Sequence, residues 1–134
     1  MAPSNYTIKS RETASREARP TSIEIERQGE VCIIRCHGSL LAGLDEDYVY
    51  AKIEDIKKLK CSRVLADFRN VPAIGSTGIA FIIEIYTSIV KTDGGRFVLT
   101  GPAPLVQRVL DITKLSTIIS VAPDFGSGLD ALSA

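Results

Sequence analysis

Long blocks of like charge are missing from this sequence. Its 134 residues include 16 lysine and arginine and 16 aspartate and glutamate side chains, which gives a formal net charge of +0. The two signs are interspersed along the chain. Blocks of one sign are what draw a protein to nucleic acid or to anionic lipid. We therefore expect no direct nucleic-acid partner.

Long apolar runs are missing too. The most apolar stretch, residues 78–90, is interrupted by Glu84, whereas a membrane-spanning helix needs about 20 predominantly apolar residues. We therefore expect no membrane insertion. The first 20 residues contain three arginines but no apolar block after them, unlike a secretory signal. The expected location is the cytoplasm.

Cysteine and histidine are scarce. The three cysteines, Cys32, Cys36 and Cys61, are an odd number without the spacing of metal ligands. We expect all three to be inert packing residues, since buried cysteine behaves as a small apolar side chain. The glycine motifs G-x-x-x-x-G-K-[ST] and G-x-G-x-x-G are absent. No metal site and no cofactor are implied.

Strand and helix patterns alternate after residue 20. Two adjacent β-branched segments, 22–27 and 31–37, predict an antiparallel hairpin. The remaining segments predict strands at 63–68, 96–100 and 117–121, and helices at 44–59, 76–91, 104–113 and 124–132. Short links between alternating elements favour parallel strands with right-handed crossovers. We predict an α/β fold, a mixed sheet of about five strands with parallel central strands, packed by about four helices.

The predicted domain begins near residue 21. Residues 1–20 are polar, show no sustained apolar period and end at Pro20. Such a segment buries too little apolar surface to hold its own structure. We predict a polar N-terminal extension over 1–20 and one domain over 21–134, since a chain of this length supports one core.

The most informative segment is 70–79, NVPAIGSTGI, which joins a predicted buried strand to a buried helix. Gly75 and Gly78 flank the hydroxyl residues Ser76 and Thr77. Either hydroxyl is suited to cap the helix by accepting a bond from a free backbone amide. A phosphate on Ser76 would instead bring nearly two negative charges to the helix N-terminus and would repel a docked partner. The residues alone leave both interpretations open.

A serine beside glycines at a strand-to-helix turn also suggests the nucleophile of a small hydrolase. However, the segment G-S-T-G does not match G-x-S-x-G. The single histidine, His37, is expected to end a strand rather than to act as a general base. The hydrolase is the remote alternative.

Several short motifs follow one another in a fixed order. They are the initial hairpin, G-S-L at 38–40, D-F-x-x-V at 67–71, Ser76-Thr77-Gly78 opening an apolar helix, the strand at 96–100, and V-Q-R-V-L-D-I-T-K-L at 106–115. This order resembles the STAS domain of anti-sigma-factor antagonists. The resemblance implies that Ser76 takes the place of the serine that a partner kinase, itself the anti-sigma factor, phosphorylates. Thr77 is the second choice.

Two positions depart from the usual pattern of this family. The turn usually reads Asp-Ser-Ser-Gly or Asp-Ser-Thr-Gly, but Gly75 replaces the acidic residue here. Leu40 and Leu41 stand where many members carry an aspartate. The missing carboxylates favour a second interpretation, in which the domain is never phosphorylated and serves as a scaffold or regulatory subunit of a stress-signalling complex or transporter.

The resemblance implies a regulator of transcription without catalytic activity. Its expected partners are an anti-sigma factor with serine kinase activity and a serine phosphatase, and a homodimer stays open. We expect the carboxylate of Asp67 to bond backbone amides of the next turn. The expected partner contacts are Gly75, Ser76, Thr77, Gly78, Ile79, Leu41 and Arg69.

Overall fold

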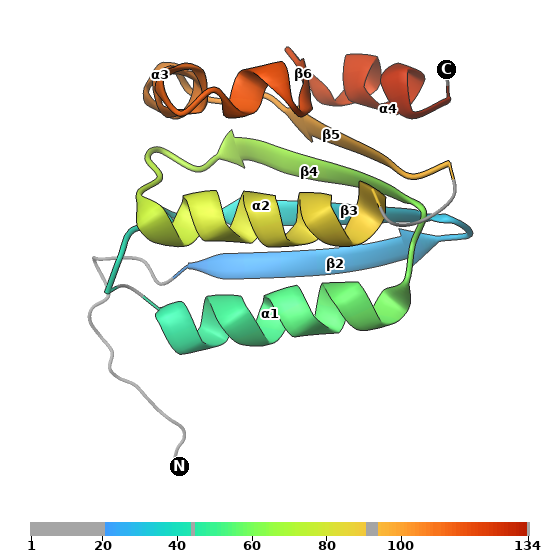
Figure 1. Cartoon of the computed structure of the whole chain (residues 1–134), viewed down its shortest axis with the longest axis horizontal. Helices are drawn as coiled ribbons and strands as arrows, with labels where there is room; N and C mark the ends of the chain where they lie inside the picture. The colour runs from blue at the N-terminus through green and yellow to red at the C-terminus, as the bar shows by residue number, and fades with distance from the viewer. Residues whose placement is uncertain (1–20, 44, 91–93, 134) are drawn as a thin grey trace.

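The computed structural model describes residues 21–43, 45–90 and 94–133. The predicted extension over 1–20 lies outside these residues. The elements are β2 (Ser22–Gln28), β3 (Val31–His37), α1 (Glu46–Leu59), β4 (Arg63–Asn70), α2 (Ser76–Val90), β5 (Arg96–Thr100), α3 (Pro104–Ile112), the 3-10 turn η1 (Leu115–Thr117), β6 (Ser120–Ala122) and α4 (Phe125–Ser133). The predicted alternation of strands and helices is confirmed (Figure 1).

The five strands form one mixed sheet in the order β2-β3-β4-β5-β6. β2 and β3 pair antiparallel as the predicted hairpin, and each later pair is parallel. A helix follows each of the strands β3, β4 and β5, as parallel crossovers require. The predicted mixed sheet with parallel central strands is confirmed.

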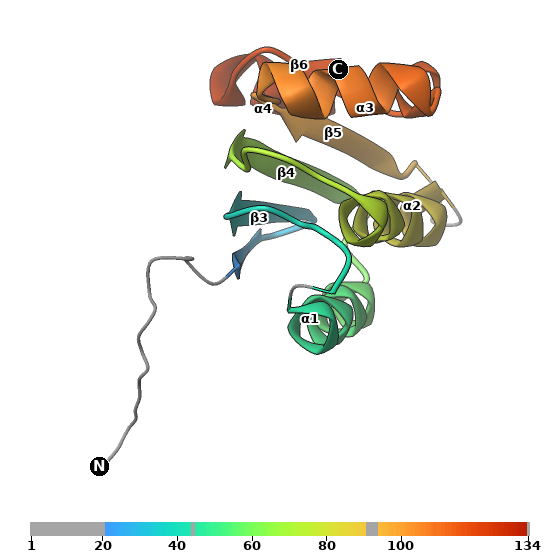
Figure 2. The ribbon, with the colours of Figure 1, turned by 90° about the vertical axis from the view of Figure 1, so that its left-hand side faces the viewer.

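The helices cover the two faces of the sheet unequally. Figure 2 shows α1, α2 and α3 on one face, whereas α4 lies on the other. The main core lies under the first three helices, and it includes Ile34, Val49, Phe68, Phe81, Leu99 and Leu110. A smaller core lies under α4 and consists of Leu65, Val98, Ala122 and Leu132. β4 contributes to both cores, because its successive side chains point to opposite faces.

The predicted strand over 117–121 is wrong in its first half. Thr117 belongs to η1, and β6 begins at Ser120. The amides of Ile118 and Ile119 both donate to the carbonyl of Leu115, at 2.9 and 3.0 Å. Leu115 and Ile119 are buried in the main core. Packing therefore holds a tight turn where β-branched residues favour a strand.

The prediction that all three cysteines are inert packing residues is wrong for two of them. Cys32 in β3 and Cys61, between α1 and β4, form a disulfide. All three cysteines are buried as expected, and Cys36 remains a free thiol whose pKa is raised by burial and then by the charge of Asp67. Cys32 and Cys61 are 29 positions apart, and no pattern in the sequence indicated that they would form a disulfide.

The helices that the structure describes are short relative to a bilayer. None of those in residues 21–43, 45–90 and 94–133 is both long and apolar enough to cross a membrane.

Candidate functional site

The segment around Ser76 lies at the carboxyl edge of the parallel strands. β4 ends at Asn70, and α2 begins at Ser76. Between them, Ile74 forms an isolated parallel bridge with Leu40, which lies three residues after the end of β3. The amides of Gly75 and Gly78 both donate to the carbonyl of Leu40, at 2.8 and 3.1 Å. These bonds fix the start of α2 against the connection between β3 and α1.

Ser76 is the first residue of α2, and its side chain is exposed. The interpretation in which the hydroxyl of Ser76 caps the helix does not hold. Gly75 occupies the cap position, since its carbonyl accepts the amide of Ile79 at 3.0 Å. Within the residues that the structure describes, the Ser76 hydroxyl makes no hydrogen bond. An exposed, unbonded hydroxyl is accessible to another protein.

Thr77 has the opposite environment. Its side chain is only 1% exposed, and its hydroxyl donates to Oε2 of Glu46 at 3.4 Å. The amide of Gly43 donates to the same oxygen at 2.7 Å. Thr77 is therefore a structural residue, and Glu46 is an acidic residue of the site that sequence reasoning missed. Only one indication of Glu46 was present in the sequence, namely the acidic residues at the start of α1. The contact with Thr77 was not indicated, because the two residues are 31 positions apart.

The glycines of this segment permit close packing. A Cβ atom on Gly78 would lie 2.7 Å from Cβ of Ile74, closer than such atoms approach, and 3.1 Å from Cβ of Leu40, which is a tight contact. A Cβ atom on Gly75 would lie 3.5 Å from Cδ2 of Leu41, an ordinary contact. Leu41 and Ile79 are half-buried. Gly78 is buried like Thr77, so among the expected contact residues near Ser76 only Leu41, Gly75, Ser76 and Ile79 reach the surface, and none of them is charged.

Arg69 lies apart from that surface. It is exposed, and its Cβ faces Gly101 at the end of β5. Its guanidinium is 3.5 Å from Oδ2 of the buried Asp67, whose Oδ1 accepts the amide of Arg69 at 3.0 Å. Asp67 was expected to bond backbone amides of the next turn, but the amide that it accepts belongs to Arg69, which still lies within β4. Both residues line a cavity of about 190 Å³ beside Phe125 of α4, on the face opposite to α2.

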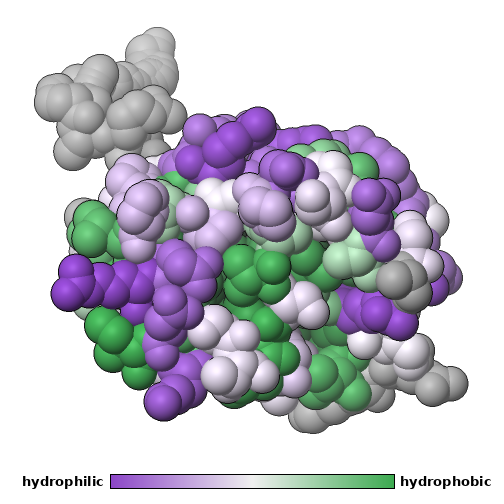
Figure 3. All heavy atoms as spheres, turned by 90° about the horizontal axis from the view of Figure 1, so that it is seen from above, coloured by the Kyte–Doolittle hydropathy of each residue, from purple (hydrophilic) through white to green (hydrophobic). Residues whose placement is uncertain are grey.

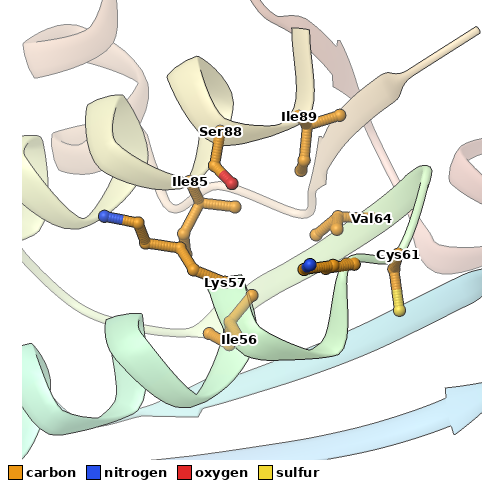
Figure 4. A pocket seen from close by; sticks show the side chains of 8 residues that line it. Ile56, Lys57, Cys61, Val64, Ile85, Ser88 and Ile89 are labelled. Atoms are coloured by element: carbon orange, nitrogen blue, oxygen red, sulfur yellow. The ribbon is translucent and has the colours of Figure 1, made fainter. Parts of the chain in front are cut away.

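A larger cavity, of about 360 Å³, lies between the C-terminal halves of α1 and α2 (Figure 4). Its floor consists of core side chains such as Ile85 and Val64, each 1% exposed. At its rim, the ammonium of Lys57 is 3.4 Å from Glu84 and 3.5 Å from Glu54, and these carboxylates raise the pKa of Lys57. This cavity lies at the other end of α2 from Ser76.

His37 ends β3 as expected, and its Nε2 lies 3.9 Å from a carboxylate oxygen of Glu24 on β2. Over residues 21–43, 45–90 and 94–133, no group of three or more histidine, cysteine or acidic side chains is placed to hold a metal ion.

Known proteins resemble this chain in sequence and in fold. The anti-sigma F factor antagonist of Paenibacillus polymyxa is 25% identical over 99 residues, which span 74% of this chain and 84% of that protein. The structure of an anti-sigma factor antagonist from Mycobacterium paratuberculosis superposes with a TM-score of 0.76 at 16% identity, over 85% of this chain and 95% of that one.

The Bacillus cell fate determinant SpoIIAA in its phosphorylated form has the same fold, with a TM-score of 0.61 and 18% identity over 83% of this chain and 99% of that one. The five-stranded mixed sheet and its helices match the fold of these structures. Residues 22–128 match the STAS domain. The chain belongs to the STAS domain family.

Proposed function

We propose that this chain is an anti-sigma-factor antagonist that acts by protein contact and without catalysis. In its unphosphorylated form it binds an anti-sigma factor with serine kinase activity, and that kinase phosphorylates Ser76 and ends the binding. A serine phosphatase restores the active form. The observation that carries this proposal is the exposed Ser76 side chain on the first residue of α2.

The surroundings of Ser76 explain why a phosphate would act as a switch. The partner would contact Leu41, Gly75 and Ile79 together with Ser76, on a surface that carries few charges. A phosphate there is stabilised by the amides and the dipole at the start of α2. To bind there, the partner would have to desolvate the doubly charged phosphate at the interface, and this cost weakens the complex.

The relatives support this proposal by their names and states. The curated relative is an anti-sigma F factor antagonist, and one structural neighbour was solved in a phosphorylated form. We place the activity in the domain from residue 21 onward and in the cytoplasm. Reducing conditions there keep most cysteines as thiols, so binding should not require the bond between Cys32 and Cys61.

The proposal is tested by incubating the purified chain with ATP, Mg²⁺ and each candidate serine-kinase anti-sigma factor. Mass spectrometry then locates the phosphate, with Ser76→Ala as the control. We expect one phosphate on Ser76 and none on the control protein. Ser76→Asp should weaken binding to the same kinase on the order of tenfold, while Ser76→Asn, which adds no charge, should weaken it less. Equal binding of both variants would contradict the switch.

A scaffold that is never phosphorylated is the second candidate. It is favoured by Gly75 and Leu41, which stand at positions where relatives of the family carry a carboxylate. Its signature in the same assay is a stable complex without phosphate on Ser76. Such a scaffold would serve a stress-signalling complex or a transporter.

A homodimer remains a prediction. Figure 3 shows apolar side chains among polar ones on the side formed by α3, β6 and α4. Among the large apolar residues of the molecule, Ile112, Ile118 and Leu105 are 70%, 52% and 60% exposed. Sedimentation velocity over a range of concentrations measures the oligomeric state directly.

A further inference from the structure

The structure brings one acidic side chain to the start of α2. Oε2 of Glu46 accepts hydrogen bonds from the amide of Gly43 at 2.7 Å and from the hydroxyl of Thr77 at 3.4 Å. Glu46 therefore joins the loop before α1 to the residue that follows Ser76. The first turn of α2 itself contains no acidic residue.

A phosphate on Ser76 would lie close to this carboxylate. Ser76 and Thr77 are consecutive, so their Cα atoms are about 3.8 Å apart, and Glu46 already reaches Thr77. The two charged groups would lie within roughly one Debye length, about 8 Å, where salt screens their repulsion only in part. The phosphate has the first-turn amides as partners. Glu46 is half exposed and is able to turn toward water.

We propose that Glu46 is a positioning residue that transmits the phosphorylation state of Ser76 to the loop over residues 41–43. This inference rests on the proposed function. Without phosphate, Glu46 holds Gly43 in place and keeps Leu41 beside Gly75. The phosphate displaces the Glu46 carboxylate and releases Gly43. Phosphorylation thus changes the partner surface in the loop as well as at Ser76.

The test uses the full chain, labelled with ¹⁵N, with phosphoserine installed at position 76 during translation so that no kinase is needed. We expect the amide proton signal of Gly43 to move upfield, toward its position in Glu46→Ala. Exchange of that amide with solvent should accelerate on the order of tenfold, because a hydrogen bond to a charged group is lost. Ser76→Asn should leave the Gly43 signal in place.

The same phosphoserine in Glu46→Ala protein should cause no further shift at Gly43. An unchanged Gly43 signal in the phosphorylated wild-type chain would overturn the inference. So would an equal shift with and without Glu46, because the phosphate would then act on the loop directly. The kinase assay tests the proposed function separately. Even if no kinase phosphorylates Ser76, the protein with phosphoserine installed during translation shows whether a phosphate there shifts the Gly43 signal.

Discussion

The amide of Gly75 donates a hydrogen bond of 2.8 Å to the carbonyl of Leu40. This bond joins the residue before the candidate phosphorylation site to the connection between β3 and α1. Because Gly78 donates to the same carbonyl, the start of α2 is set by backbone contacts rather than by a side-chain cap. A substitution at Gly78 should therefore affect the stability of this region, whereas a substitution at Ser76 should not.

Gly78→Ala should lower the free energy of unfolding by about 1 to 3 kcal/mol, because the added methyl group overpacks the turn. Its Cβ atom would meet Cβ of Ile74 at 2.7 Å. Gly75→Ala is the matched control, since the nearest atom to its Cβ is 3.5 Å away, and its effect should stay within about 0.5 kcal/mol. Urea unfolding followed by circular dichroism measures both. Equal losses would show that the close contact at Gly78 relaxes without cost.

Ser76→Ala should change the free energy of unfolding by no more than about 0.5 kcal/mol, because its exposed hydroxyl makes no hydrogen bond in the described part of the chain. Thr77→Val should cost about 0.5 to 1.5 kcal/mol, because it removes the buried hydroxyl that bonds Glu46. Thermal unfolding of the two variants beside the wild type makes the comparison. A larger loss for Ser76→Ala would restore its role as a helix cap.

Reduction of the disulfide between Cys32 and Cys61 should lower the free energy of unfolding by about 3 to 4 kcal/mol, because the unfolded chain regains the entropy of an open loop. The separation of the two residues is 29 positions. Denaturant unfolding with and without a dithiol reductant gives the difference. Cys61→Ser serves as the control and should not respond to the reductant. An equal response of the control would trace the effect to something other than this bond.

The stability contributed by Asp124 should depend on pH. The backbone amide of Ser127 bonds Oδ1 of Asp124 at 2.8 Å and lowers the pKa of that carboxyl below its ordinary value. A group with a lowered folded pKa stabilises the protein above its unfolded pKa, and this contribution is lost as the pH falls through the folded pKa. Acid unfolding should therefore show a smaller pH dependence in Asp124→Asn. An equal pH dependence of stability in the wild type and in Asp124→Asn would refute this expectation.

The fold followed from the sequence because its signals are local. Alternation in β2, the β-branched residues of β3 and the apolar length of α2 each report on their own element. Where tertiary contacts decide, sequence reasoning failed. Leu115 and Ile119 enter the core from a turn rather than from a strand. Cys32 and Cys61 meet only when α1 returns the chain to β3.

The site was predicted in part for the same reason. The position of Ser76 at the start of an apolar helix is a local signal, and it is confirmed. The cap position of Gly75 depends on where the helix begins, which sequence patterns locate to within a residue or two. Glu46 reaches the site through a fold of the chain that no local pattern contains, and Arg69 turns to the opposite face because side chains of β4 alternate.

Because α4 packs on a separate, smaller core, we expect it to open at a lower free energy than the rest of the molecule. The small core beneath that helix consists of four buried side chains, one of them Leu132 of the helix itself, whereas most of the core lies under α1, α2 and α3 on the other face. A unit with few buried contacts opens at a lower free energy than the whole protein. The C-terminal helix should therefore detach and redock as a sub-global fluctuation, exchanging its amides first, while the serine at the start of α2 keeps its native geometry throughout.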